Sequence, residues 1–123
     1  HNVGFMAVDR WAQDNETSPA WRERFSALVA PIVQGESPGI RCLAVKPQDF
    51  MNRSGDAVAQ AARFHKTQPE KIVVVHDELD FDFGRVQIKF GGGHGGHNGL
   101  RDIHQKLGSA NYVRVRVGIG RPT

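Results

Sequence analysis

Three segments of the chain carry residues at the three- and four-residue spacing of an amphipathic helix. The first helix is predicted over residues 3–14. The second begins near Ser54 or Asp56, since either side chain can accept the first amide hydrogens of a helix. A third, shorter helix is predicted to end at Gly108. The repeating positions are Val3, Met6, Ala7, Trp11 and Ala12, then Val58, Ala61, Ala62 and His65, then Leu100, Ile103 and Leu107.

Five other segments have the sequence patterns of β-strands. Two apolar runs, 27–33 and 40–45, flank a turn that contains glycine and proline, and they predict a β-hairpin. Residues 71–77 form a continuous run rich in β-branched residues, which is typical of a strand covered on both faces. Residues 85–90 and 112–119 alternate, so each is expected to have one solvent-exposed face. Those faces carry Arg85, Lys89, Arg114 and Arg116.

The order of these elements predicts an α/β fold, because helices and strands interleave along the chain. A chain of 123 residues is long enough for one core and too short for two. Residues 1–123 are therefore expected to form a single-domain three-layer sandwich with a twisted mixed β-sheet flanked by helices. The charged segment 15–24 is expected to be a surface connection. Asp77 falls at the carboxyl end of its strand, and that edge of an open α/β sheet is where ligands bind.

Composition and charge restrict the compartment and the partners. The chain has 16 Lys and Arg against 13 Asp and Glu, a net charge of +3 that permits an anionic partner without requiring one. No apolar run approaches the roughly 20 residues of a membrane-spanning helix, and no signal-peptide pattern is visible, so the cytoplasm is predicted. The single cysteine, Cys42, fits a reducing compartment and is interpreted as structural.

The segment 91–99 is the most unusual feature of the sequence, with six glycines in nine residues. Glycines let the backbone approach a partner closely, and a helix N-terminus at the end of the segment can receive an anion. The segment is not a phosphate-binding P-loop, because no Lys-Ser or Lys-Thr follows its last glycine. On its own it indicates either a functional loop or a strained turn.

A zinc site is a second interpretation of the same region. His94 and His97 together with His76 raise this possibility, but no cysteine and no helical spacing fix a ligand geometry. The acidic residues Asp77 and Asp80 can hold a cation, although a carboxylate at a strand end is more often an orienting partner or a cap. No metal is predicted.

Five segments, in this order and at these separations, closely resemble the bacterial-type peptidyl-tRNA hydrolase family. The resemblance runs along the whole chain, and the glycine-histidine-asparagine segment is its most specific part. The segments are His-Asn-Val-Gly at 1–4, Phe-Met-Asn-Arg-Ser-Gly at 50–55, His-Asp-Glu-Leu-Asp at 76–80, Gly-Gly-Gly-His-Gly-Gly-His-Asn-Gly-Leu at 91–100 and Arg-Val-Gly-Ile-Gly at 116–120.

The resemblance implies an enzyme that hydrolyses the ester bond between peptide and tRNA. His1 matches the general base that activates water, and Asp77 matches the acid that orients this histidine. Asn52 and Asn98 match amides that hold the peptide end and the reacting carbonyl region, and Phe50 matches an aromatic residue of the binding site. We therefore expect His1 and Asp77 on one side of a cleft. We also expect Asn98 to cap the third helix and to share a pocket with Asn52.

The resemblance also implies the partner. Lys89 and Arg116 resemble a basic pair that clamps a phosphate of the tRNA, and basic side chains on neighbouring strands suit that role. A monomer without cofactor is implied, with peptidyl-tRNA as substrate. The family's first strand with its Asn-Pro-Gly loop, and its C-terminal segment with a helix, have no counterpart in this sequence.

Other interpretations of these residues stay open. Asn52 and Asn98 can each be only a helix cap, Asp77 a turn carboxylate, and Lys89 and Arg116 solvated charges. A non-catalytic RNA-binding relative of the same fold needs the basic residues but has no chemical need for a base and its orienting acid. A phosphate- or nucleotide-binding enzyme that uses the glycine-rich segment is a third possibility.

Overall fold

A computed structural model describes residues 3–16, 18–48 and 54–120 of the chain. Its α-helices are α1 (Val3–Asn15), α2 (Ser54–Phe64) and α3 (Asn98–Leu107), and a short 3₁₀ helix, η2, spans Pro69–Lys71. All three predicted helices are confirmed, and the third ends as expected, with Gly108 in the left-handed conformation at φ 70°. Among the described residues, no helix combines the length and apolar character that crossing a membrane requires.

The first sheet is antiparallel and contains β1 (Arg22–Arg24), β2 (Ala27–Gln34) and β3 (Ile40–Pro47) in that order. The predicted hairpin is confirmed as β2 and β3. The segment 15–24 is not only a surface connection, because its last three residues form β1 and pair with β2. Their side chains are all exposed, so no apolar pattern marked this strand.

The second sheet contains β4 (Val73–Glu78), β6 (Val113–Gly118) and β5 (Val86–Phe90) in that spatial order. The central strand, β6, runs parallel to β4 and antiparallel to β5, so this sheet is mixed. The α/β class is confirmed, but the described strands form two three-stranded sheets where one sheet was predicted. Hydrophobic patterns identify strands, but they do not identify which strands pair.

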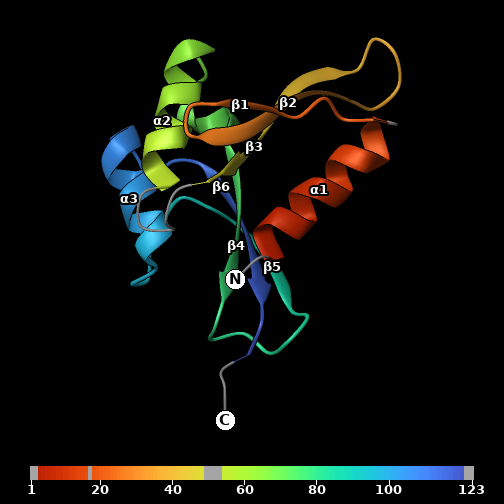
Figure 1. Ribbon diagram of the computed structural model, residues 1–123. Helices are drawn as coiled ribbons and strands as arrows, with labels where there is room; N and C mark the ends of the chain where they lie inside the picture. The colour runs from red at the N-terminus through yellow and green to blue at the C-terminus, as the bar shows by residue number, and fades with distance from the viewer. Residues whose placement is uncertain (1–2, 17, 49–53, 121–123) are drawn as a thin grey trace.

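Helices cover the second sheet unequally. Helices α2 and α3 lie together on one side of it, whereas α1 lies on the other side, against β4 (Figure 1). Leu100 and Ile103 of α3 pack with Tyr112 and Val74 in one apolar cluster. The opposite face is partly open, and Val73 at the start of β4 is 59% exposed, so the expectation that this strand is covered on both faces is wrong. The other exposed apolar side chains on that face are Val86, Ile88 and Phe90.

A separate apolar cluster joins α1 to the first sheet. Ala12 of α1 is buried against Ala30, Ile32 and Ala44 of the hairpin. Cys42 is half-buried and packs against this cluster, in agreement with its interpretation as a structural residue.

Close contact between α2 and α3 depends on Gly55. Its backbone N–H donates to the Asp102 carboxylate over 2.7 Å, and a Cβ at this position would overlap the Asp102 carbonyl oxygen. We expect Gly55→Ala to lower the free energy of unfolding by about 1–3 kcal/mol, because this overlap outweighs the better helix propensity of alanine. Denaturant unfolding of this chain measures the change.

Gly93→Ala is the matched control for this substitution. Gly93 has no positive φ, and no heavy atom lies within 4 Å of the place where its Cβ would be. Its unfolding free energy should therefore stay within about 0.5 kcal/mol of the parent value. Equal effects of the two substitutions would contradict a specific close approach at Gly55.

Candidate functional site

One face of the second sheet is polar, and it faces the glycine-rich segment. His76 pairs with Arg116 across β4 and β6, and Arg116 pairs with Gln87 across β6 and β5. Because side chains alternate along strands, Glu78, Arg114 and Lys89 point to the same side. A pocket of about 120 Å³ lies there, and we call it the basic pocket. Its lining residues are His76, Glu78, Lys89, Gly93, His94, Gly95, Leu100, Arg114 and Arg116.

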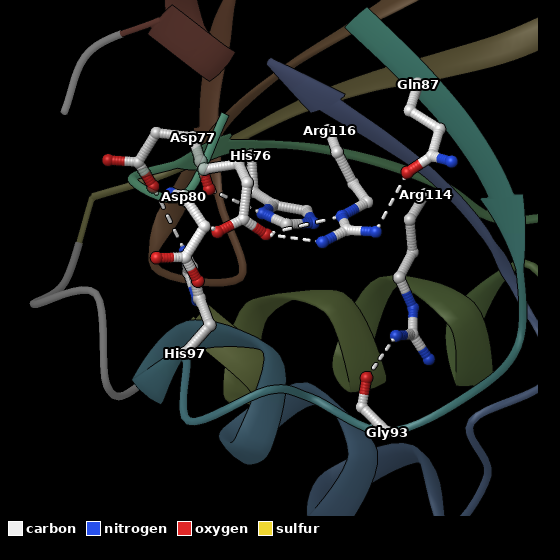
Figure 2. Close-up of polar contacts among 9 residues, drawn as sticks. His76, Asp77, Asp80, Gln87, Gly93, His97, Arg114 and Arg116 are labelled. Atoms are coloured by element: carbon white, nitrogen blue, oxygen red, sulfur yellow. Dashed lines mark hydrogen bonds and ion pairs between the residues drawn. The ribbon is translucent and has the colours of Figure 1, made fainter. Parts of the chain in front are cut away.

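Arg114 holds the glycine-rich segment against this face. Its Nη1 donates to the Gly93 carbonyl over 2.6 Å, and its Nη2 donates to the Gly92 carbonyl over 2.5 Å. Figure 2 shows the guanidinium directed at Gly93. Arg114 is only 2% exposed, so its assignment to a solvent-exposed face is wrong. The strand alternates as predicted, but the glycine-rich segment covers this position.

Glycine is required where the segment passes the sheet. Gly92 has φ 92°, and a Cβ there would lie 2.9 Å from the Nζ of Lys89. A side chain at this position would therefore strain the backbone and displace the lysine.

His97 joins the start of α3 to the carboxyl end of β4. Its Nδ1 accepts the backbone N–H of Leu100 over 3.2 Å, so His97 is the N-cap of α3. Its Nε2 lies 3.1 Å from Oδ1 of Asp77, and Figure 2 shows the two side chains meeting. A neutral imidazole that accepts at Nδ1 carries its proton on Nε2, so His97 donates to Asp77.

The prediction that Asn98 caps α3 is wrong. His97 has the extended backbone of a cap, with φ −72° and ψ 117°, and its ring supplies the acceptor. Asn98 is the first residue of the helix, and it is exposed. The Asn98 side chain is thus not needed to accept a backbone N–H at the start of α3.

His76 is buried, and its ring packs against the ring of His97. Its Nδ1 lies 2.8 Å from the Asp77 carbonyl oxygen, which only accepts, so the ring proton is on Nδ1. Burial lowers the pKa of His76, a shift that the neighbouring His97 increases and the hydrogen bond to Asp77 opposes. The ring is therefore neutral at pH 7. Its Nε2 is buried and has no hydrogen-bond partner among the described residues.

His76, Asp77 and His97 bring possible metal ligands within 4.8 Å of one another. The hydrogen bonds disfavour a metal, because Nε2 of His97 carries the proton that it donates to Asp77. The basic side chains that line the neighbouring pocket repel a cation and attract an anion. This arrangement suits hydrogen-bond chemistry beside an anion site.

Arg116 is held by two partners on the floor of the basic pocket. Its Nη2 donates to Oε1 of Glu78 over 2.8 Å. Its Nη1 donates to Oε1 of Gln87 over 2.9 Å (Figure 2). Burial of Glu78 raises its pKa, but the hydrogen bonds from Arg116 and from the Asp80 amide, together with the charge of Arg116, lower the pKa below its ordinary value. Glu78 is therefore ionised at neutral pH.

The structure places four of the seven predicted site residues. Lys89 and Arg116 line one pocket, as the predicted pair requires. Asp77 contacts His97, and Asn98 follows His97 at the start of α3. The other three, His1, Phe50 and Asn52, lie outside the described residues. The shared cleft of His1 with Asp77, and the shared pocket of Asn52 with Asn98, stay predictions.

Sequence patterns missed three contributors to this site. Glu78 and Gln87 were not selected, although the strand pattern places both on the same face as Arg116. His97 was considered only as a metal ligand or as part of the asparagine motif. Its position immediately before an apolar helical pattern was the signal for a cap.

Comparison with known proteins connects this geometry to one family. The family model described as peptidyl-tRNA hydrolase matches residues 1–123. The peptidyl-tRNA hydrolase of Geotalea uraniireducens is 51% identical over 122 residues, covering 99% of this chain and 62% of that protein. The one from Geobacter sulfurreducens is 53% identical over 122 residues, covering 99% of this chain and 61% of that protein. This chain thus spans about three fifths of the length of these relatives.

A solved structure agrees with the sequence comparison. The crystal structure of peptidyl-tRNA hydrolase from Acinetobacter baumannii superposes with a TM-score of 0.88 at 38% sequence identity. The match covers 99% of this chain and 60% of that one. With a family model that spans every residue and relatives above half identity, the chain belongs to the peptidyl-tRNA hydrolase family.

Proposed function

We propose that the protein hydrolyses the ester bond between peptide and tRNA in peptidyl-tRNA, which releases free tRNA for reuse in translation. The observation that carries this proposal is the position of the Asp77–His97 pair beside the basic pocket of Lys89 and Arg116. The Asp77–His97 pair provides a fixed carboxylate at a strand end, and the basic pocket provides cations that can bind a phosphate. Similarity to relatives that bear the name peptidyl-tRNA hydrolase supports the same activity.

The proposed chemistry is general-base hydrolysis. His1 takes a proton from water as the water oxygen attacks the ester carbonyl, and the ester oxygen leaves as the 3′ hydroxyl of the tRNA after receiving a proton. Asp77 orients His1 and stabilises its protonated form. His97 is a positioning residue, because the proton that it donates to Oδ1 fixes the rotamer of Asp77.

Asn52 and Asn98 are proposed to hold the peptide end and the carbonyl region of the substrate. Asn98 lies next to His97, and Asn52 precedes Gly55 by three positions, a separation that spans at most about 11 Å of extended chain. Gly55 is hydrogen-bonded to Asp102, one turn further along α3 than Asn98. This connection supports a shared binding region, to which Phe50 is proposed to add an aromatic contact.

The proposal extends to the assembly and location of the protein. Residues 1–123 are proposed to form a single peptidyl-tRNA hydrolase-like domain. We propose a cytoplasmic monomer that needs no cofactor. A non-catalytic RNA-binding protein is the second candidate, and turnover of peptidyl-tRNA by the full-length protein separates the two.

Lys89 and Arg116 provide the test of RNA binding. We expect Lys89→Ala or Arg116→Ala in the full-length protein to weaken tRNA binding and to reduce the slope of log K against log salt by about 1, since each lost phosphate contact releases about one counterion fewer. The loss of kcat/KM should be far larger for peptidyl-tRNA than for a minimal ester substrate without the tRNA body. Binding isotherms and initial rates across a salt series measure both effects.

Arg101→Ala is the matched control for this test. Arg101 is an exposed residue of α3 and does not line the basic pocket. It should change tRNA binding and the salt slope less than either pocket substitution. Equal losses on the two substrates, or an unchanged salt slope after Lys89→Ala and Arg116→Ala, would show that the phosphate clamp lies elsewhere.

A further inference from the structure

The guanidinium of Arg116 already has an anionic partner inside the protein. Two of its nitrogens contact one carboxylate oxygen of Glu78, Nη2 at 2.8 Å and Nε at 3.3 Å. Both side chains are largely buried, with 25% of Arg116 and 19% of Glu78 exposed. Solvent therefore screens this ion pair less than it screens a pair on the open surface.

Glu78 is the one acidic residue among the described residues that line the basic pocket. Three cations line the same pocket, but the guanidinium of Arg114 is directed at the backbone carbonyls of Gly92 and Gly93. Lys89 and Arg116 are thus the two pocket cations that can contact an incoming anion. Glu78 neutralises the charge of Arg116. The resident carboxylate sets the net charge that an incoming anion meets.

A carboxylate and a phosphate compete for the same donors of an arginine. Both accept paired hydrogen bonds from the planar guanidinium, so a phosphate that contacts Arg116 meets a site that Glu78 already occupies. The phosphate must either displace the carboxylate or lie beside a like charge, and both reduce its binding free energy. Gln87 holds the remaining edge of the guanidinium with a neutral oxygen and adds no repulsion.

We propose that Glu78 is an internal competitor for the tRNA phosphate at Arg116 and that it lowers the affinity of the basic pocket for tRNA. This inference rests on the proposed function. Glu78 is a positioning residue in this role, because it acts on the ligand through Arg116. It keeps the guanidinium oriented in the absence of RNA, and it returns to Arg116 as the phosphate leaves, which favours release of product tRNA.

The test compares two opposite charge changes on the two partners of Arg116. In the full-length protein, Glu78→Gln keeps the shape of the side chain and removes its charge, whereas Gln87→Glu adds a charge on the other edge of the guanidinium. We expect Glu78→Gln to bind deacylated, 5′-phosphorylated tRNA about 3- to 10-fold more tightly. Gln87→Glu should bind it more weakly by a similar factor, and the double variant should be close to the parent.

Salt dependence distinguishes this role from a structural one. Glu78→Gln should steepen the dependence of tRNA binding on salt, because Arg116 then neutralises a phosphate in place of Glu78. Glu70→Gln makes the same change in net charge at an exposed position outside the basic pocket, so it should have a smaller effect on both quantities. A lost fold would weaken binding in every variant and would not reverse sign between Glu78→Gln and Gln87→Glu.

Two results overturn the inference, and they are distinguishable. If Arg116→Ala weakens tRNA binding but Glu78→Gln does not strengthen it, Glu78 is no competitor and the proposed function is unaffected. If Arg116→Ala leaves tRNA binding unchanged, the clamp itself is wrong and the inference is lost with it. Should Glu78→Gln be too unstable to assay, the weakening expected for Gln87→Glu decides the question, and unchanged binding in that variant counts against the competition.

Discussion

Replacement of Asp77 by Asn in the full-length protein is expected to lower kcat for peptidyl-tRNA hydrolysis by about 10²- to 10⁴-fold. The amide keeps the size of the carboxylate and one acceptor oxygen for the proton of His97. It has no negative charge to stabilise a protonated His1, and its nitrogen donates where a second acceptor is needed. Steady-state rates on peptidyl-tRNA, with KM measured separately, give the size of the effect.

Asp82→Asn is the control for the loss of charge at this end of β4. Asp82 is exposed, lies in the loop after β4 and does not line the basic pocket. Its substitution removes one carboxylate from the same end of the sheet and should change kcat by less than about 3-fold, since surface substitutions are usually within about 0.5 kcal/mol. If Asp77→Asn retained a comparable rate, Asp77 would not be the orienting acid.

Replacement of Arg114 by Met is expected to release the glycine-rich segment from the sheet. The substitution removes the hydrogen bonds to the carbonyls of Gly92 and Gly93, and also one of 3.3 Å to Ala110. We expect a loss of about 1–3 kcal/mol in unfolding free energy, since buried hydrogen bonds from a charged donor to backbone carbonyls are lost. Denaturant unfolding and amide hydrogen exchange of residues 92–96 measure the change, and tRNA binding should fall because the pocket wall is no longer held.

Arg114→Lys tests whether charge or shape is responsible. Lysine keeps the charge, but its single ammonium cannot reproduce the planar fork that contacts adjacent carbonyls. Arg114 lies over the ring of Tyr112. Burial raises the pKa of Tyr112 to about 12, so its hydroxyl is neutral at neutral pH and does not balance the charge of Arg114. We expect exchange of 92–96 in Arg114→Lys to rise nearly as much as in Arg114→Met. If residues 92–96 were as well protected from hydrogen exchange in both variants as in the parent, the glycine-rich segment would keep its position without Arg114.

Sequence patterns were sufficient for most elements because local spacing determines them. The helical repeat in α1 and the Gly108 stop of α3 are features of neighbouring residues, and both are present in the structure. The strand β4 begins at Val73 and not at 71, because Pro69 starts a 3₁₀ turn that includes Lys71. Strand pairing depends on contacts between distant residues, so the division into two sheets was not visible in the pattern.

The candidate site shows the same limit. The position of Asp77 at a strand end followed from the apolar run before it, and the placement of Lys89 and Arg116 on the polar faces of their own strands followed from alternation. The burial of Arg114 depends on a covering segment that is distant along the chain, and alternation contains no information about covering. The cap was assigned to Asn98 because asparagine is the commoner capping residue, whereas the ring of His97 has the suitable acceptor.

The central place of β6 has a consequence for the order in which the protein assembles. Of the described strands, β4 and β5 each pair with β6 alone, and β6 follows both of them and α3 in the sequence. During synthesis, β4 and β5 therefore leave the ribosome before β6, the strand that pairs with both of them, has been made. Contacts between residues so far apart along the chain are slow to form, because the intervening segments must first be ordered. Arg114 and Arg116 arrive on that joining strand, so the basic pocket closes in the same late step as the sheet.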